Sequence, residues 1–224
     1  MNASLYRLFC EHLSEHKQQR FDEVAAARTR HFTLVLEDIY QSQNASAILR
    51  TAESCGVQDL HLIENEHSFS HYQRISKGAS KWLTLHHYNQ TTNNTRSCLE
   101  HLKAQGYHIA VTHLNEKTIP IQEIDFTKKI ALVLGTELTG ASNTATELAD
   151  SLVSIPTVGF TESLNVASAA SIATHYATEK LKSNPSIPWQ LTDEEKIEVK
   201  VQWARNSIYW WEKIESDWNA NHEF

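Results

Sequence analysis

The chain has 224 residues, 41% of them hydrophobic and 21% charged, and its formal net charge is −7. These values exclude a disordered or fibrous chain, and no apolar run has the length of a membrane span, so we expect no membrane partner. The negative charge is the opposite of the basic balance that nucleic-acid-binding domains usually carry.

The cysteines and the N-terminus both bear on location. Cys10, Cys55 and Cys98 are widely spaced and contain no C-x-x-C pair, so they predict neither a disulfide framework nor a zinc site. Residues 1–20 are too charged for a signal peptide. We therefore expect a protein of the reducing cytoplasm.

Residues 1–30 are predicted to form a helical N-terminal extension, because apolar side chains recur at helical spacing from Leu5 to Leu13. This is the only segment with a positive balance, five Lys or Arg against four Asp or Glu. His12 and His16 match the H-x-x-E-H pattern of inverted zinc peptidases. No second motif supplies a third ligand, so we expect no metal.

Residues 31–182 alternate between short apolar runs and helical segments, which predicts one main α/β domain. The predicted strands are 32–36, 60–63, 82–87, 107–113, 130–134 and 152–155, and the predicted helices include 44–55 and 95–105. Strands separated by helices of this length favour a mostly parallel sheet with helices on both faces.

Two polar residues stand out in the first predicted helix. Asn44 lies at its start, where the side chain can cap free N–H groups or face whatever lies above the strand ends. Arg50 follows Ile48 and Leu49, so its guanidinium must reach out to solvent, pair with a carboxylate or bind an anion. The sequence alone leaves a structural salt bridge and an anion site open.

A glycine-bracketed segment follows the predicted strand 130–134. Gly135 and Gly140 enclose Glu137 at the carboxyl end of this strand, where open α/β sheets bind their ligands. An ordinary strand-to-helix turn would have the same composition. The spacing is neither a P-loop nor a G-x-G-x-x-G fingerprint, and no such fingerprint follows Leu36, which argues against a dehydrogenase.

The segment from Ser154 to Lys182 joins a strand to a helix of small residues. Pro156 ends the strand, Gly159 permits a tight turn, and Ser163 is predicted to cap the helix. The small side chains leave room for another backbone, a second subunit or a ligand. A tightly packed strand-loop-helix unit would explain the same pattern.

Residues 183–224 are predicted to form a helical C-terminal extension. Thr192 and Glu195 form a capping box for one long helix, along which an apolar stripe extends to Trp218. This acidic segment holds four Lys or Arg against eight Asp or Glu. Packing of the stripe on the core or on a second subunit is favoured over stacking of nucleobases. The aromatic side chains concerned are Trp203, Tyr209, Trp210 and Trp211.

Three segments resemble motifs of one family. In chain order, NASAILR (44–50), LVLGTELTG (132–140) and IPTVGFTESLNVASAA (155–170) are similar to the three motifs of the SpoU/TrmH branch of the SPOUT RNA methyltransferases. KGASKWLTLHH and HIAVTHL resemble the same proteins, so the similarity covers most of residues 31–182. The resemblance implies a C-terminal trefoil knot, a homodimer, and terminal extensions that help to hold tRNA.

The resemblance also implies an activity, the transfer of a methyl group from S-adenosylmethionine to a ribose 2′-hydroxyl of tRNA. The D-loop guanosine is the expected target, and 23S rRNA or another tRNA position is the alternative. A non-catalytic RNA-binding relative would be expected to lack Arg50, Asn44 or Asn165, and all three are present.

The site residues follow from the motifs. The resemblance implies catalytic roles for Arg50, Asn44, Glu137, Ser163 and Asn165. It implies that the cofactor binds Thr112, His113, Leu114, Gly135, Ile155, Ser163, Leu164 and Asn165. Because a guanidinium stays protonated in proteins, we expect Arg50 to stabilise oxyanion charge while a phosphate or Glu137 takes the proton. The cations of the N-terminal extension are the expected RNA contacts, namely Arg7, Lys17, Arg20, Arg28 and Arg30.

Overall fold

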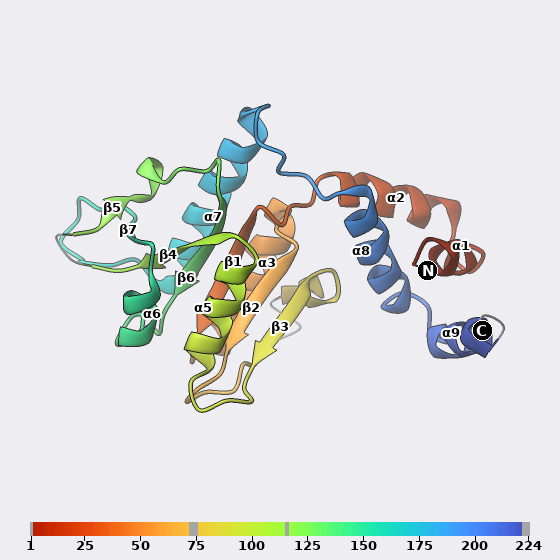
Figure 1. Cartoon of the computed structure of the whole chain (residues 1–224), viewed down its shortest axis with the longest axis horizontal. Coiled ribbons are helices and arrows are strands. Elements are labelled where there is room, and N and C mark those ends of the chain that lie inside the picture. The colour runs from red at the N-terminus through yellow and green to blue at the C-terminus, as the bar shows by residue number, and fades with distance from the viewer. Residues whose placement is uncertain (1, 72–75, 115–116, 221–224) are drawn as a thin grey trace. The chain divides into compact units, whose positions relative to one another are not determined.

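The computed structural model describes residues 2–71, 76–114 and 117–220. It divides into two compact units (Figure 1). The larger unit is Arg30–Trp189, and the smaller unit combines Met1–Thr29 with Gln190–Phe224. The two terminal extensions of the sequence thus come together in a single helical unit.

The larger unit is built on one seven-stranded sheet with the order β3-β2-β1-β6-β4-β7-β5. Its strands are β1 Phe32–Glu37, β2 Asp59–Ile63, β3 Thr84–Tyr88, β4 Tyr107–Thr112, β5 Ile119–Pro120, β6 Lys129–Leu134 and β7 Ser151–Ser154. Neighbouring strands of the sheet run parallel, and in the central pair Leu34 is in register with Leu132. The predicted mostly parallel sheet is confirmed.

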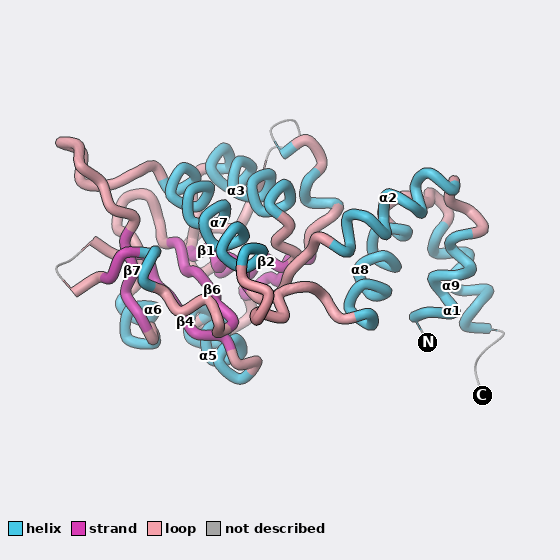
Figure 2. Tube along the Cα trace, turned by 90° about the horizontal axis from the view of Figure 1, so that it is seen from above, coloured by secondary structure: helices cyan, strands magenta, loops and turns pink. Residues whose placement is uncertain are grey.

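Helices cover both faces of this sheet (Figures 1 and 2). They are α3 Ser42–Cys55, α5 Asn94–Ala104, α6 Asn143–Leu148 and α7 Val166–Ser183, with short 3₁₀ turns η1 Ala79–Lys81 and η2 Ile121–Glu123. One apolar cluster joins the sheet to α3 and α7, and the other joins it to α5 and α6. The long runs of apolar residues in β1 and β6 follow from this burial on both sides.

The small residues of α7 pack against other parts of the same chain. Ala170, Ala173 and Ala177 are fully buried, and α7 packs along α3, where the Ser171 hydroxyl lies 2.9 Å from that of Thr51. Because small side chains let two helices approach closely, the alanine face is explained by this packing. Of the alternatives that the sequence left open, close approach of another backbone accounts for the buried alanines Ala170, Ala173 and Ala177.

The smaller unit contains the helices α1 Asn2–Cys10, α2 Glu15–Ala26, α8 Asp193–Arg205 and α9 Trp211–Ala220. The predicted capping box of Thr192 and Glu195 is confirmed at the start of α8. The predicted single long helix is wrong, because the chain leaves the helix at Asn206. The break allows Ile208 and Ile214 both to be buried, and Arg205 in α8 pairs with Glu215 in α9 at 2.9 Å.

The tail aromatics divide into two groups. Trp203 is 1% exposed and packs edge-on against Phe21 of α2, with ring centroids 5.5 Å apart. Tyr209 and Trp210 lie in the break between α8 and α9 and are exposed. Packing therefore explains Trp203.

In the described part of the chain, no helix is long and apolar enough to cross a membrane.

Candidate functional site

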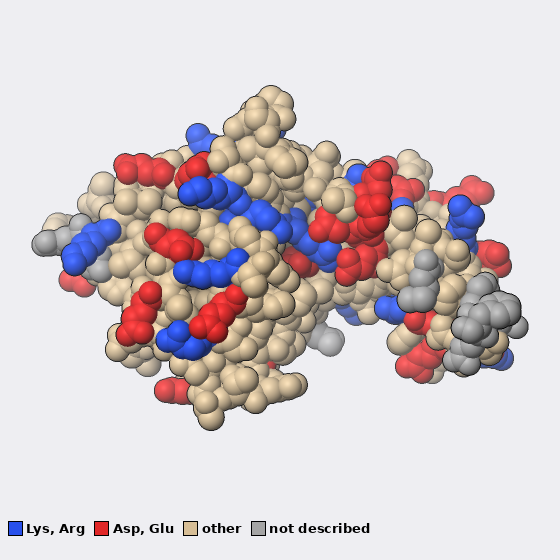
Figure 3. Space-filling view, in the orientation of Figure 1, with Lys and Arg blue, Asp and Glu red and all other residues tan. Residues whose placement is uncertain are grey.

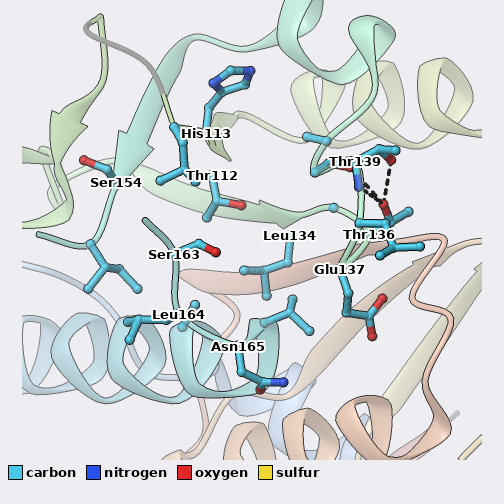
Figure 4. Close-up of a pocket in the computed structure, with 18 of the residues that line it drawn as sticks. Thr112, His113, Leu134, Thr136, Glu137, Thr139, Ser154, Ser163, Leu164 and Asn165 are labelled. Carbon is cyan, nitrogen blue, oxygen red and sulfur yellow. Dashed lines mark hydrogen bonds between the residues drawn. The ribbon is translucent and has the colours of Figure 1, made fainter. Parts of the chain in front are cut away.

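A cavity of about 580 Å³ opens at the carboxyl ends of β4, β6 and β7. Three loops line it, at 112–114, 134–141 and 153–166 (Figure 4). Gln41 and Asn44, at the start of α3, complete the lining. Each loop follows a parallel strand directly, so the sheet sets the position of all three. This is the part of an open α/β sheet where ligands bind.

The loop at 134–141 closes tightly on itself. Thr136 and Gly140 exchange two backbone hydrogen bonds of 3.0 and 3.1 Å, and Gly140 has φ +72°. A Cβ atom on Gly135 would lie 2.2 Å from the backbone of Gly140 and Ala141. Glycine at position 135 is therefore required by the loop itself, in addition to any ligand.

Glu137 is anchored at the edge of the cavity. Its Oε1 accepts hydrogen bonds from Asn44 Nδ2 at 2.8 Å and from the Gln41 amide at 3.3 Å. Among the residues that the structure describes, its Oε2 has one long contact, 3.4 Å from the Tyr40 amide. The carboxylate is thus fixed through Oε1, which leaves Oε2 able to accept a further hydrogen bond.

Asn44 connects Glu137 to the loop that precedes α7. The Nδ2 atom of Asn165 donates to Asn44 Oδ1 at 3.1 Å. Asn44 therefore donates to a carboxylate and accepts from an amide, and its side chain faces the cavity rather than capping α3. Figure 4 shows Glu137 and Asn165 along the same side of the cavity.

Asn165 is the residue that caps α7. Its Oδ1 accepts hydrogen bonds from the amides of Ala167 and Ser168 at 2.9 and 3.2 Å. The prediction that Ser163 caps this helix is wrong, because the helix begins three residues later than Ser163. Ser163 lines the cavity with Leu164 instead.

Predicted cofactor residues gather around the cavity. Thr112 is fixed by its hydroxyl, which donates to Val133 O at 2.9 Å, and the His113 amide donates to Val153 O at 3.0 Å. All eight predicted positions line the cavity, namely Thr112, His113, Leu114, Gly135, Ile155, Ser163, Leu164 and Asn165. Leu114 and Leu164 keep part of their apolar surface exposed.

Arg50 lies apart from this constellation. It is exposed on α3 and does not line the cavity that holds Asn44 and Glu137. Within residues 2–71, 76–114 and 117–220 it makes no ion pair or hydrogen bond. The structural salt bridge that the sequence left open is therefore absent from the described chain, and the guanidinium is available to an external anion.

The five cations predicted to bind RNA differ in position. Arg28 is 1% exposed, with its guanidinium 5.5 Å from the ring centre of Trp203, so it is not a surface cation. Arg30 pairs with Asp59 at 3.0 Å, and its side chain is 16% exposed. For these two residues the prediction is wrong, because packing and pairing occupy their charges. Arg7 and Arg20 are exposed, and Lys17 is half-buried.

The charge argument for the N-terminal extension also changes. Residues 1–29 and 190–224 form one unit, and together they hold eight Lys or Arg and twelve Asp or Glu. Figure 3 shows acidic side chains among the basic ones on this unit. The positive balance of residues 1–30 therefore does not extend to the folded unit.

The described residues contain no cluster of His, Cys, Asp or Glu that could hold a metal.

Sequence reasoning missed two acidic residues that support the site. Glu37 is 2% exposed and accepts hydrogen bonds from Ser142 N and Oγ at 2.9 and 2.7 Å, which fixes the end of the 134–141 loop. Asp38 is 7% exposed, has φ +50°, and accepts from the amides of residues 65–67. The sequence signal that could have identified them is a pair of adjacent acidic residues at the end of a buried strand.

Known proteins resemble the chain over most of its length. The model of the SpoU rRNA Methylase family matches residues 31–175. The tRNA (guanosine(18)-2'-O)-methyltransferase of Borreliella burgdorferi is 35% identical over 91% of this chain and 91% of its own. The Thermus thermophilus protein of the same name is 31% identical over 86% of this chain and 97% of its own. The crystal structure of the Aquifex aeolicus TrmH/SpoU tRNA modifying enzyme has a TM-score of 0.76 and 28% identity, over 87% of this chain and 98% of that one. The chain therefore belongs to the SpoU rRNA methylase family.

Proposed function

We propose that the chain transfers a methyl group from S-adenosylmethionine to the ribose 2′-hydroxyl of the D-loop guanosine at position 18 of tRNA. The observation that carries the proposal is the cavity at the strand ends, with the Asn165–Asn44–Glu137 chain of hydrogen bonds along its edge. The names of the Borreliella burgdorferi and Thermus thermophilus relatives support tRNA and this guanosine as substrate.

The cavity fits the proposed methyl donor. Apolar side chains for an adenine ring come from Leu114, Leu134, Ile155 and Leu164, and a carboxylate for a cationic group comes from Glu162. S-adenosylmethionine supplies an electrophilic methyl group on a sulfonium centre when it is bound. Gly135 lets the 134–141 loop close on itself, and residues 134–141 line the cavity.

The chain itself would orient the hydroxyl and remove its proton. A ribose hydroxyl is a poor nucleophile at neutral pH, so a fixed acceptor for its proton and a fixed direction of attack supply much of the catalysis. We assign the proton acceptor to Glu137 Oε2, because Oε1 is already occupied by Asn44 and Gln41. As the new C–O bond formed, the bond between the methyl carbon and the donor's sulfur would break and the neutral thioether S-adenosylhomocysteine would leave. The proton of the 2′-oxygen would pass to this carboxylate and then to water. Ser163 lines the same cavity and is proposed to contact the ribose.

Arg50 is proposed to act from a second copy of the chain. Its guanidinium stays protonated, so it stabilises negative charge on the attacking oxygen or holds a neighbouring phosphate. It is exposed and lies outside the cavity of its own chain, as a residue that serves a partner's site would. A homodimer is further supported by four exposed apolar side chains of the larger unit, namely Leu138, Val158, Phe160 and Ile172.

Further features belong to the same proposal. A C-terminal trefoil knot is supported by the family and by the sheet order, in which β7 lies between the earlier strands β4 and β5. We propose three parts of the chain: an N-terminal extension that holds RNA (residues 1–30), a catalytic domain (residues 31–182) and a second, C-terminal extension (residues 183–224). Arg7, Lys17 and Arg20 are the proposed phosphate contacts, and the cytoplasm, where three free cysteines are stable, is the proposed location.

The test is methyl transfer by the purified protein. Unmodified tRNA transcript and S-adenosylmethionine should give one 2′-O-methylated guanosine in the D-loop, mapped by resistance of the ribose linkage to alkaline cleavage. A transcript with 2′-deoxyguanosine at that position should accept no methyl group. Failure to bind S-adenosylmethionine, or methylation of 23S rRNA in place of tRNA, would overturn the proposal.

A further inference from the structure

Tyr40 is an exposed aromatic side chain beside the proposed catalytic carboxylate. It is 68% exposed, whereas its neighbour Ile39 is 4% exposed and anchors the same turn in the core. The Tyr40 amide donates to Glu137 Oε2 at 3.4 Å, and the next residue, Gln41, lines the cavity. The ring therefore contributes little to the core, and the backbone of Tyr40 is held next to the residues that line the cavity.

A second aromatic ring accompanies it. The imidazole of His67 lies 5.0 Å from the Tyr40 ring, centre to centre, with the two planes inclined by 58°. His67 comes from the loop after β2 and Tyr40 from the loop after β1, so the pair bridges neighbouring strand ends. Contact with His67 limits rotation of the Tyr40 ring while leaving its surface open to solvent.

One buried carboxylate holds both loops. Asp38, two residues before Tyr40, accepts hydrogen bonds from the amides of Asn65, Glu66 and His67 at 2.8, 2.9 and 3.2 Å. Its own amide donates to Ile63 O at 2.9 Å, and it keeps a left-handed backbone, φ +50°, that non-glycine residues seldom adopt. The aromatic pair is therefore presented by a fixed turn.

From these observations we infer that Tyr40 and His67 form a stacking platform for a nucleobase of the substrate RNA, either that of the methylated nucleotide or that of its neighbour. The inference rests on the proposed function, because it places the ribose at Glu137. With the 2′-oxygen at Glu137 Oε2, the base of the same or the adjoining nucleotide reaches Tyr40, which is bonded to the same oxygen through its amide. Exposed aromatic rings bind splayed-out bases by stacking.

Stacking on an aromatic ring predicts a specific loss on truncation. Tyr40→Ala should raise the KM for tRNA by about 5- to 150-fold, the range for one lost base stack. Tyr40→Phe should keep a KM within about 3-fold of the wild type, because the phenyl ring still stacks. His67→Ala should show a smaller rise in the same direction. His101→Ala, which removes an exposed histidine on α5, is the matched control and should leave KM unchanged.

A direct probe separates stacking from other effects. A set of tRNA transcripts carries 2-aminopurine either at the methylated position or at one of the neighbouring positions. Binding of the wild type should quench the 2-aminopurine fluorescence at one of these positions. Tyr40→Ala should abolish that quenching and Tyr40→Phe should retain it. The dissociation constant of S-adenosylmethionine should be the same for all variants. Unchanged KM and quenching in Tyr40→Ala, or an equal loss of S-adenosylmethionine binding, would overturn the inference. A wild-type protein that methylates no tRNA would overturn the proposed function instead.

Discussion

The side-chain amide of Asn165 makes two kinds of hydrogen bond. Its nitrogen donates to Asn44, and its oxygen accepts from the first backbone amides of α7. Nδ2 donates to Asn44 Oδ1 at 3.1 Å, and Oδ1 caps the first amides of the helix. One side chain thus joins the first and third sequence motifs, which are 121 residues apart. The cap fixes the rotamer that presents the nitrogen to Asn44, so helix capping and site geometry depend on the same atoms.

The two roles of Asn165 can be separated by substitution. Asn165→Ala should lower the free energy of unfolding by about 1 kcal/mol, the usual effect of losing a helix cap, and should also lower kcat. Asn165→Asp restores the cap but cannot donate to Asn44 as a carboxylate, so stability should return while kcat stays low. Thermal unfolding and single-turnover methylation measure the two effects. Equal kcat values for Asn165→Asp and wild type would refute the link to Asn44.

Gly135 offers a steric prediction. Gly135→Ala places a methyl group 2.2 Å from the backbone of Gly140 and Ala141, so the 134–141 loop must open. The affinity for S-adenosylmethionine should fall by more than tenfold, measured by calorimetry. Gly159→Ala is the matched control, because the nearest atoms to its Cβ are 4.0 Å away and belong to Thr161. Comparable affinities for the two variants would show that the loop tolerates a side chain.

Local patterns were enough to predict the sheet and the loops around the cavity. The apolar runs at 32–36 and 130–134 became β1 and β6 because burial on both faces demands continuous apolar sequence. Glu137 could be placed at a strand end by its position after such a run. Its bond to Asn44 could not, because no local pattern reports which side chains meet across 93 residues.

Other features depended on contacts that the sequence does not encode locally. Arginine usually lies on the surface, yet Trp203 from the other end of the chain covers Arg28. The stripe that continues to Trp218 predicts one helix, but burial of Ile208 and Ile214 together requires a break. Ser163 and Asn165 both suit a helix cap, and only the path of the backbone decides between them.

The N-terminal cations provide a prediction about RNA binding. Replacing Arg7, Lys17 and Arg20 by glutamine should weaken tRNA binding and reduce the slope of log affinity against log salt by about 0.7 to 0.9 per lost phosphate contact. Arg28→Gln should instead lower the thermal midpoint without changing that slope, because the guanidinium is buried over Trp203. Filter binding at several salt concentrations checks both. An unchanged slope in the triple variant would exclude the extension as the electrostatic contact.

Stability should fall at mildly acidic pH because of His61. Burial, with a further contribution from His86, lowers the pKa of His61 to about 3, and Asp59 offsets part of this effect. Between about pH 6.5 and pH 3 the unfolded chain binds a proton that the folded chain excludes, so stability decreases as pH falls through this window. The loss should reach about 2 kcal/mol at pH 5.

The control for this prediction is His61→Gln. Glutamine removes the titrating ring and can still hydrogen-bond to Tyr88, whose hydroxyl lies 3.2 Å from His61 Nδ1. The variant should lose less stability between pH 7 and pH 5 than the wild type, whatever its stability at pH 7. Urea unfolding at both pH values measures the difference. Parallel losses in the two proteins would assign the pH dependence to groups other than His61.

The role of Arg50 can be tested by mixing two inactive variants. Arg50→Ala should lower the methylation rate by orders of magnitude with little change in affinity for S-adenosylmethionine, and Glu137→Gln should also be nearly inactive. If Arg50 serves the partner's cavity, a mixed dimer has one site with both changes and one site with neither. Random pairing makes about half of the dimers mixed, so the mixture should recover about a quarter of the wild-type activity. If Arg50 serves the cavity of its own chain, every site carries one change and the mixture stays inactive. Light scattering on the wild type provides the control, since a monomer at micromolar concentration would exclude both the dimer and the exchange of Arg50.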